Sequence, residues 1–178
     1  NDTNSSIGSY TGGSGIDTIE SKGGDLGAVS TGSAADSVTL SLGAVITGAV
    51  TLGANSDTID GNDSLTLNAS TITGNVNTGS GADSVSVLNT STVTGNVTLG
   101  TTTDSADGAD SLTVTGTSSS FKSVITGSIA TGGGADSLDL TNATIGGAGQ
   151  TITLGSDNNG LDGNDSLTAS GTAITCLL

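Results

Sequence analysis

Apolar residues alternate with polar ones in short runs that recur along most of the chain. Each run follows an aspartate and a serine or threonine, as Leu65 and Leu67 do after Asp63. Alternation of this kind predicts a β-strand with one buried face. The regular placing of aliphatic residues also argues against a disordered chain, which is the alternative for an acidic sequence rich in Gly, Ser and Thr.

The alternating run belongs to a repeat that is marked by Asp, then Ser or Thr, then an aliphatic residue. Its aspartates are Asp17, Asp36, Asp63, Asp83, Asp110, Asp136 and Asp165. The shorter gaps between them are 19 and 20 residues, and the longer gaps are 26 to 29 residues. Aspartate-rich inserts lengthen the gaps before Asp63, Asp110 and Asp165, whereas the stretch TSSSFKS lengthens the gap before Asp136.

Two further short strands are expected in each repeat. The first ends in Thr-Gly, at 45–48, 71–74, 92–95 and 124–127. The second follows at once, at 49–52, 75–77, 96–99 and 128–130. Three strands with glycine-marked corners predict one coil of a solenoid, in which stacked coils bury the aliphatic side chains. We expect an all-β parallel β-solenoid of about seven coils, roughly 20 residues per coil with acidic loop inserts, and not an antiparallel β-sandwich.

Composition agrees with this fold. There is no proline, and strands inside a stack must all donate ladder hydrogen bonds. Tyr10 and Phe121 are the only aromatic residues, so the core must consist of Val, Ile, Leu and Ala. Cys176 is the only cysteine, so no intrachain disulfide forms. The first residues are polar, and we assign 1–10 to an N-terminal arm and 11–178 to a single β-solenoid domain.

The charge excludes several classes of function. The chain has 17 acidic and 2 basic residues, a net charge of −15, which would repel a nucleic acid. No apolar run approaches the roughly 20 residues of a membrane span. Histidine is absent, and no nucleophile relay or phosphate loop is present. Glycosidases with paired carboxylates usually add aromatic and basic residues that are missing here, so we expect the chain not to be an enzyme.

Most of the acidic residues fall in one part of the repeat. Coils that stack in register would place the repeat aspartates in a column, roughly 5 Å apart, where like charges repel. Lys22 and Lys122 lie elsewhere in the repeat, so the carboxylates either take up protons or share cations. Oxygen ligands on glycine-bent loops suit Ca²⁺, and a solvated acidic edge is the alternative. The candidate ligands are Asp17, Asp36, Asp57, Asp60, Asp63, Asp83, Asp104, Asp107, Asp110, Asp136, Asp157, Asp162 and Asp165.

These corners resemble a known family. GGSGIDTIE at 12–20 is similar to the nonapeptide G-G-x-G-x-D-x-U-x of RTX proteins, the hemolysin-type calcium-binding repeat, where U is a large aliphatic residue. TGSGADSVS at 78–86 and TGGGADSLD at 131–139 keep all but the first glycine, and DGNDSL at 60–65 and 162–167 resembles a common variant. The resemblance covers about a third of the chain. It implies β-roll corners, Ca²⁺ in the turns with the repeat aspartates as ligands, and secretion by a bacterium.

The chain also departs from that family. RTX arrays run their nonapeptides back to back, whereas each one here is followed by two further strands. Several coils carry an acidic insert as well. The exact geometry of the ligands therefore does not transfer from the family to this chain.

The ends of the expected stack point to a structural role. We find no amphipathic helix to cover them, and the C-terminal GTAITCLL is apolar. Without an initiating Met, the chain is expected to be a mature secreted product or a piece of a longer protein. We predict an extracellular subunit or repeat segment of a calcium-stabilised bacterial filament, surface layer or adhesin. Its open solenoid ends would bind further copies of the chain head to tail.

Two alternatives remain. An ice-binding β-solenoid would use an outward threonine ladder, although Thr is also a common exposed strand residue; the candidates are Thr47, Thr73, Thr94 and Thr126. A glycosylated adhesin stalk would carry sugars on Asn-X-Ser/Thr triplets; these begin at Asn4, Asn68, Asn89, Asn96 and Asn142.

Overall fold

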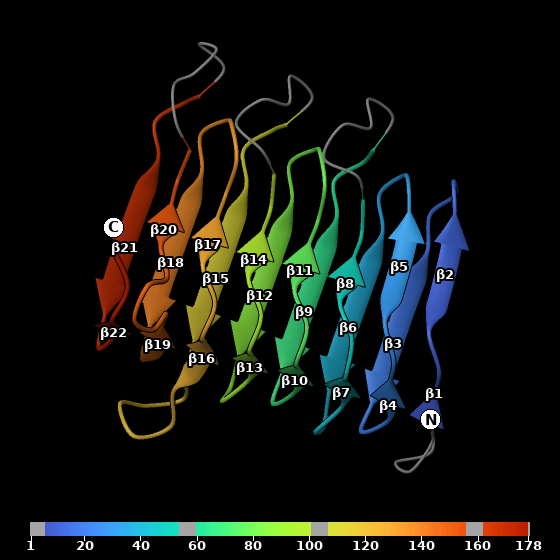
Figure 1. Ribbon diagram of the computed structural model, residues 1–178, viewed down its shortest axis with the longest axis horizontal. Coiled ribbons are helices and arrows are strands. Elements are labelled where there is room, and N and C mark those ends of the chain that lie inside the picture. The colour runs from blue at the N-terminus through green and yellow to red at the C-terminus, as the bar shows by residue number, and fades with distance from the viewer. Residues whose placement is uncertain (1–5, 54–59, 101–106, 156–161, 178) are drawn as a thin grey trace.

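The computed structural model describes residues 6–53, 60–100, 107–155 and 162–177. Over these residues the chain forms 22 strands and no helix. The strands belong to three parallel sheets, in which neighbouring strands come from successive coils (Figure 1). β1 (Ser6–Ile7) and β22 (Ala173–Ile174), the first and last of these strands, lie at opposite ends of the stack. The prediction of an all-β parallel β-solenoid of about seven coils is therefore confirmed.

The alternating runs form one sheet of seven strands, which we call the long-strand sheet. Its strands are β3 (Thr18–Lys22), β6 (Ser37–Ser41), β9 (Ser64–Asn68), β12 (Ser84–Leu88), β15 (Ser111–Thr115), β18 (Ser137–Thr141) and β21 (Ser166–Ser170). Inward side chains align from coil to coil, since Val85 pairs with Leu65 on one side and Leu112 on the other. All three are 0% exposed, so the alternation in the sequence is the in-and-out alternation of this sheet.

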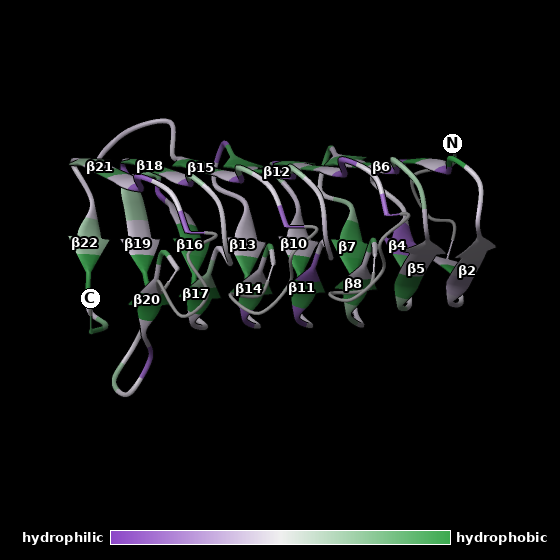
Figure 2. Ribbon diagram, turned by 90° about the horizontal axis from the view of Figure 1, so that it is seen from above, coloured by the Kyte–Doolittle hydropathy of each residue, from purple (hydrophilic) through white to green (hydrophobic). Residues whose placement is uncertain are grey.

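Shorter strands form the other two sheets. The first short-strand sheet contains β1 (Ser6–Ile7), β4 (Asp25–Leu26), β7 (Val45–Ile46), β10 (Thr71–Ile72), β13 (Thr92–Val93), β16 (Ser123–Ile125), β19 (Ala143–Ile145) and β22 (Ala173–Ile174). The second contains β2 (Tyr10–Gly13), β5 (Val29–Gly32), β8 (Val50–Thr51), β11 (Val76–Asn77), β14 (Val97–Thr98), β17 (Ile129–Ala130) and β20 (Ile152–Thr153). In Figure 2 the long-strand sheet lies along the top of the stack, with the two other sheets below it.

The corner between the two short-strand sheets requires glycine. A Cβ atom at Gly74 would lie 2.3 Å from the carbonyl oxygen of Gly48 in the preceding coil. Gly95 and Gly127 meet the coil before them at the same distance. The coils therefore pack backbone against backbone here, which explains the recurring Thr-Gly of the sequence.

The core is aliphatic along the stack. The side chains of Leu40, Ile46, Leu65 and Ile125, among others, are fully buried. In the first coil Tyr10 takes the position that Val29 takes in the next coil. Its side chain is partly buried and packs against this core.

The first described residues, Ser6 and Ile7, already belong to the stack, because β1 pairs with β4. Residues 6–10, which the sequence analysis placed in an arm, thus include residues that belong to two sheets. The stretch TSSSFKS protrudes between β15 and β16 and is closed by an antiparallel bridge from Ser118 to Phe121. The Phe121 side chain is exposed.

Candidate functional site

The repeat aspartates form a continuous column at the corner that leads into the long-strand sheet. We call the set of Asp17, Asp36, Asp63, Asp83, Asp110, Asp136 and Asp165 the aspartate column. The backbone N–H of each aspartate donates to Oδ1 of the aspartate in the next coil. The N to Oδ1 distances are 2.7 Å (Asp17 to Asp36), 2.7 Å (Asp36 to Asp63), 2.8 Å (Asp63 to Asp83), 2.7 Å (Asp83 to Asp110), 2.9 Å (Asp110 to Asp136) and 2.9 Å (Asp136 to Asp165). Stacking thus brings together all seven aspartates, as the sequence predicted.

The column lies inside the solenoid rather than on its surface. Its interior members are only 1% or 2% exposed, namely Asp36, Asp63, Asp83, Asp110 and Asp136. Their Oδ2 atoms are buried and accept no hydrogen bond from the described residues. A buried carboxylate with a bare oxygen is costly unless a proton or a cation neutralises it. These five aspartates therefore do not form the solvated acidic edge that was the alternative to a cation site.

Burial perturbs the protonation of the column. It is the main cause that raises the pKa of Asp63 to about 8, of Asp83 to about 6 and of Asp110 to about 9. Burial also raises the pKa of Asp136. The N–H that each of these carboxylates accepts favours the anion and acts in the opposite direction.

The inserts place a second set of aspartates beside the column. Oδ1 of Asp60 accepts the N–H of Gly61 (3.1 Å), and its Oδ2 accepts the N–H of Ser80 in the next coil (3.3 Å). Oδ2 of Asp107 accepts the N–H of Gly133 in the next coil (2.8 Å). Asp162 accepts the N–H that follows it in the chain, at 3.2 Å. The other three predicted ligands, Asp57, Asp104 and Asp157, lie outside the described residues.

Glycines form a cradle around the insert aspartates. A Cβ atom at Gly53 would lie 1.7 Å from Oδ2 of Asp60, and one at Gly79 would lie 2.4 Å from the same atom. The equivalent pair around Asp107 consists of Gly100 and Gly132. From the sequence, these glycines were expected only at the corners of the coil. Their spacing relative to the insert aspartates was the signal that could have identified the cradle.

These features partly fit Ca²⁺. Buried carboxylate oxygens next to a second carboxylate in a glycine cradle are the hard oxygen ligands that this ion prefers. Across residues 6–53, 60–100, 107–155 and 162–177, however, no three acidic side chains converge as a ready metal-binding group. A bound ion would therefore take its remaining ligands from backbone oxygens or water. Calcium binding stays a prediction.

The threonine ladder has a role in the stack itself. Thr73, Thr94 and Thr126 are exposed, and their hydroxyls donate to backbone carbonyls of the preceding coil at 2.8, 2.7 and 2.8 Å. Thr47 makes the same contact at 3.2 Å. These hydrogen bonds explain why threonine recurs at this corner. Ice binding stays a prediction that a thermal hysteresis measurement would test.

Three of the candidate glycosylation triplets begin where a strand of the long-strand sheet ends, at Asn68, Asn89 and Asn142, and a fourth begins at Asn96 between β13 and β14. Asn68 and Asn89 are exposed and stack on each other, with Nδ2 of Asn89 donating to Oδ1 of Asn68 at 2.9 Å. Asn89 and Asn142 have positive φ values of 53° and 49°, a conformation that Asn tolerates better than most residues. Oδ1 of Asn96 accepts the N–H of Ser128 at 2.9 Å. Asn4 lies outside the described residues, and glycan attachment stays a prediction.

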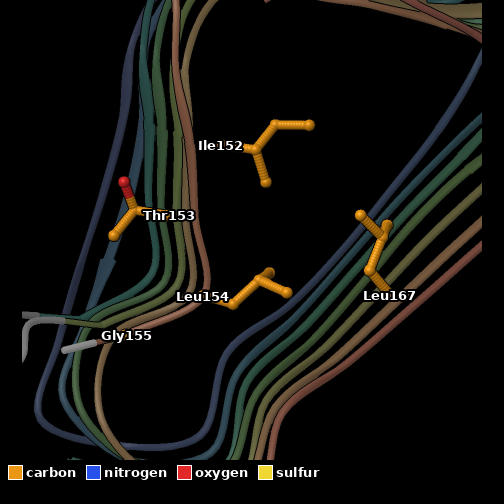
Figure 3. A pocket seen from close by; sticks show the side chains of 5 residues that line it. All are labelled: Ile152, Thr153, Leu154, Gly155 and Leu167. Carbon is orange, nitrogen blue, oxygen red and sulfur yellow. The ribbon is translucent and has the colours of Figure 1, made fainter. Parts of the chain in front are cut away.

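The C-terminal end of the stack opens onto the core. A hollow of about 380 Å³ is lined there by Ile152, Thr153, Leu154, Gly155 and Leu167. In Figure 3 the side chains of Ile152, Leu154 and Leu167 point into the same space between two walls of the solenoid. The lone cysteine, Cys176, is partly buried in the last coil and packs against the core.

The described part of the chain contains no helix with the length and apolar character needed to cross a membrane. Comparison with known protein families, with curated proteins and with solved structures found no match for the chain.

Proposed function

We propose that the chain is a non-catalytic structural segment of a secreted, calcium-stabilised bacterial filament, surface layer or adhesin. Its coils would continue head to tail into a second copy of the chain. The observation that carries the proposal is the open end of the core: Leu167 is 36% exposed there, whereas Leu138, one coil earlier in the same column, is 0% exposed. Open strand edges with exposed apolar side chains favour the addition of a further coil.

In the long-strand sheet the two end faces are complementary in register, whereas in the first short-strand sheet β22 already covers β19, so β1 of a second copy would have to leave the place that β22 occupies. Among the described strands, none lies over β21 in the long-strand sheet and none lies beneath β3 at the other end. Placing β3 of a second copy over β21 would set Ile19 over Leu167, which continues the inward aliphatic column. The N–H of Asp165 would then face Oδ1 of the second copy's Asp17. This would repeat the hydrogen bond that joins each pair of successive aspartates within the column.

Charge does not oppose this contact locally. β21 carries no charged side chain, and β3 carries Glu20 and Lys22, whose side chains form an ion pair at 2.6 Å. The net charge of −15 resides mainly in the aspartate corners. Calcium bound at those corners would lower the repulsion between successive coils, both within one chain and across the joint between two chains.

Assembly can be tested with one variant at the open end and one control on the side of the stack. Leu167→Asp places a charge on the open end, and Leu42→Asp changes a side chain that is 73% exposed at a lateral corner. We expect the wild type and Leu42→Asp to form elongated particles in CaCl₂, by light scattering and negative-stain microscopy. Leu167→Asp should remain a discrete monomer. A wild type that stays monomeric in CaCl₂ over a wide concentration range contradicts head-to-tail assembly.

The calcium part of the proposal has a separate test. Circular dichroism and thermal unfolding of the wild type are compared in CaCl₂ and in EDTA. Because cations would neutralise buried carboxylates, we expect a higher unfolding temperature in CaCl₂. MgCl₂ at the same ionic strength controls for screening. Identical unfolding in CaCl₂, MgCl₂ and EDTA would remove calcium from the proposal and leave assembly to be judged separately.

A further inference from the structure

Coils of two kinds alternate through the middle of the stack. Short coils reach their column aspartate through a tight glycine and alanine corner; they lead to Asp36, Asp83 and Asp136. Long coils reach theirs through an insert that ends in a second aspartate three residues before the column; they lead to Asp63, Asp110 and Asp165. The two kinds also differ at the inward residue that precedes the corner glycine. That residue is threonine in short coils (Thr31, Thr78 and Thr131) and leucine in long coils (Leu52, Leu99 and Leu154).

In a short coil the threonine supplies a hydroxyl next to the column. Oγ1 of Thr78 is buried and donates to the carbonyl oxygen of Leu99 at 2.9 Å, and Oγ1 of Thr31 makes the same contact with Leu52 at 2.9 Å. A short coil thus holds a single carboxylate at this corner, with a threonine as the inward neighbour.

A long coil has the opposite arrangement. Leu52 and Leu99 are 0% exposed and offer no hydroxyl, while the insert adds a second carboxylate. Negative charge is thus doubled in the coils whose inward neighbour is apolar.

Buried oxygens without a partner occur in both kinds of coil. Among the described residues Oδ2 of Asp36, Asp83 and Asp136 in short coils has no hydrogen-bond partner, and neither do Oδ2 of Asp63 and Oδ2 of Asp110 in long coils, where both side chains are 2% exposed. Each of the two long-coil aspartates lies in the same coil as a carboxylate that a glycine cradle holds against the next coil: Asp60 for Asp63, and Asp107 for Asp110. A divalent cation between the two carboxylates of a pair would satisfy the bare oxygen and the paired charge at once.

We propose that calcium binds this solenoid in its long coils only, with Asp60 and Asp63 as one carboxylate pair and Asp107 and Asp110 as the other. This inference rests on the proposed calcium-stabilised function and specifies where the ions lie. The third pair, Asp162 and Asp165, is at the open end, where Asp165 is exposed. It binds more weakly until a following coil covers it. The short-coil aspartates have no second carboxylate beside them and hold no ion, so a proton neutralises their bare Oδ2 atoms.

The proposal contrasts with what the RTX resemblance implies. The resemblance makes ligands of all seven repeat aspartates, including Asp83 and Asp136, whose nonapeptide-like stretches 78–86 and 131–139 lie in short coils. The arrangement of carboxylates points instead to Asp63 and Asp110. Counting bound ions in matched variants separates the two placements.

The test measures bound calcium per chain. The protein is stripped with EDTA, titrated with CaCl₂ by isothermal calorimetry, and its retained metal is counted by mass spectrometry after desalting. We expect one tightly held ion for each buried pair in the wild type. Asp60→Asn and Asp63→Asn should each lose one ion, and Asp107→Asn should lose the other. Asp83→Asn, the short-coil control, should keep both.

Asparagine preserves the size of the side chain and its Oδ1 acceptor, and circular dichroism of each stripped variant confirms that the fold is kept. Asp107→Asn repeats the test independently if Asp63→Asn fails to fold. An ion lost from Asp83→Asn, or one ion for every coil of the wild type, would overturn the long-coil placement while leaving calcium stabilisation intact. A wild type that retains and binds no calcium would overturn both.

Discussion

The seven-residue sequence DGNDSLT occurs twice in the chain, at 60–66 in the middle of the stack and at 162–168 in the last coil. In both copies the final residues begin a strand of the long-strand sheet. The environments differ, however. Leu65 is 0% exposed and Asp63 is 2% exposed, whereas Leu167 is 36% exposed and the whole of β21 is exposed.

Strand formation depends on the local sequence, whereas burial depends on the stacking of coils. Identical residues adopt the same strand, so the local sequence and one neighbouring coil are sufficient for strand formation. Burial of the leucine and of the aspartate requires a coil on each side. The unusual chemistry of the aspartate column therefore belongs to the stack and is absent from a single repeat.

The largest difference between the two copies is expected for the leucines. Leu65→Ala leaves a cavity between two coils and should lower the free energy of unfolding by about 3 kcal/mol. Leu167→Ala removes a side chain that is partly in solvent and should cost less than about 1 kcal/mol in the monomer. Urea unfolding followed by circular dichroism measures both. Equal losses would mean that the last coil is as well packed as the middle of the stack.

The second prediction concerns the buried aspartates of the middle coils, which should make the stability of the metal-free protein depend on pH. Because the folded-state pKa values of Asp63, Asp83 and Asp110 are raised, the folded state binds these protons more tightly than the unfolded chain. Their contribution to stability is fully present below about pH 4. It is lost as the pH rises through about 6 for Asp83, about 8 for Asp63 and about 9 for Asp110.

We therefore expect the free energy of unfolding in EDTA to fall steadily from pH 4 to pH 9, by up to about 1.4 kcal/mol per pH unit for each group that titrates. Asp63→Asn should flatten the part of the profile near pH 8, whereas Leu42→Ala, at a lateral corner, should leave its shape unchanged. Urea unfolding at a series of pH values measures the profile. Stability that rises over this range would mean that the column is ionised in the folded state.

The smallest difference is expected for the asparagines. Oδ1 of Asn62 accepts the N–H of Ala82 in the next coil at 3.0 Å, and Asn62 is exposed. Asn62→Ala should cost about 0.5–1 kcal/mol, since the hydrogen bond is replaced by water. Asn164 occupies the same place in the last coil, and Asn164→Ala should change the stability of the monomer by less than about 0.3 kcal/mol. If a second copy covers the last coil, Asn164→Ala should weaken the association of the two copies by a free energy similar to that lost on Asn62→Ala.

Much of the fold was readable in the sequence because a solenoid repeats its contacts. The alternation of Leu65 and Leu67 predicted a half-buried strand, and the spacing of Asp63 and Asp83 placed them in neighbouring coils. Both predictions are confirmed. The chemistry of the site was less accessible. The sequence indicated a column of aspartates, but not that their Oδ1 atoms accept N–H groups from the preceding coil.

Other features depended on contacts between coils that no single repeat contains. The cradle of Gly53 and Gly79 around Asp60 joins residues of two coils, so no single repeat reveals it. The exchange of Thr78 for Leu99 at one inward position is visible in the printed sequence. Its meaning emerges only in the stack, where Oγ1 of Thr78 donates to the carbonyl oxygen of Leu99.

The sequence by itself determined the architecture: an aliphatic, proline-free repeat of about 20 residues with glycine at its corners can satisfy its backbone only by stacking in parallel. Only the tertiary structure decided which aspartates are buried and which oxygen atoms remain without a partner. The reason is physical, because burial and electrostatic coupling arise between coils, from residues 19 to 29 positions apart in the chain. A local pattern specifies which residues recur, and the stack specifies what each of them faces.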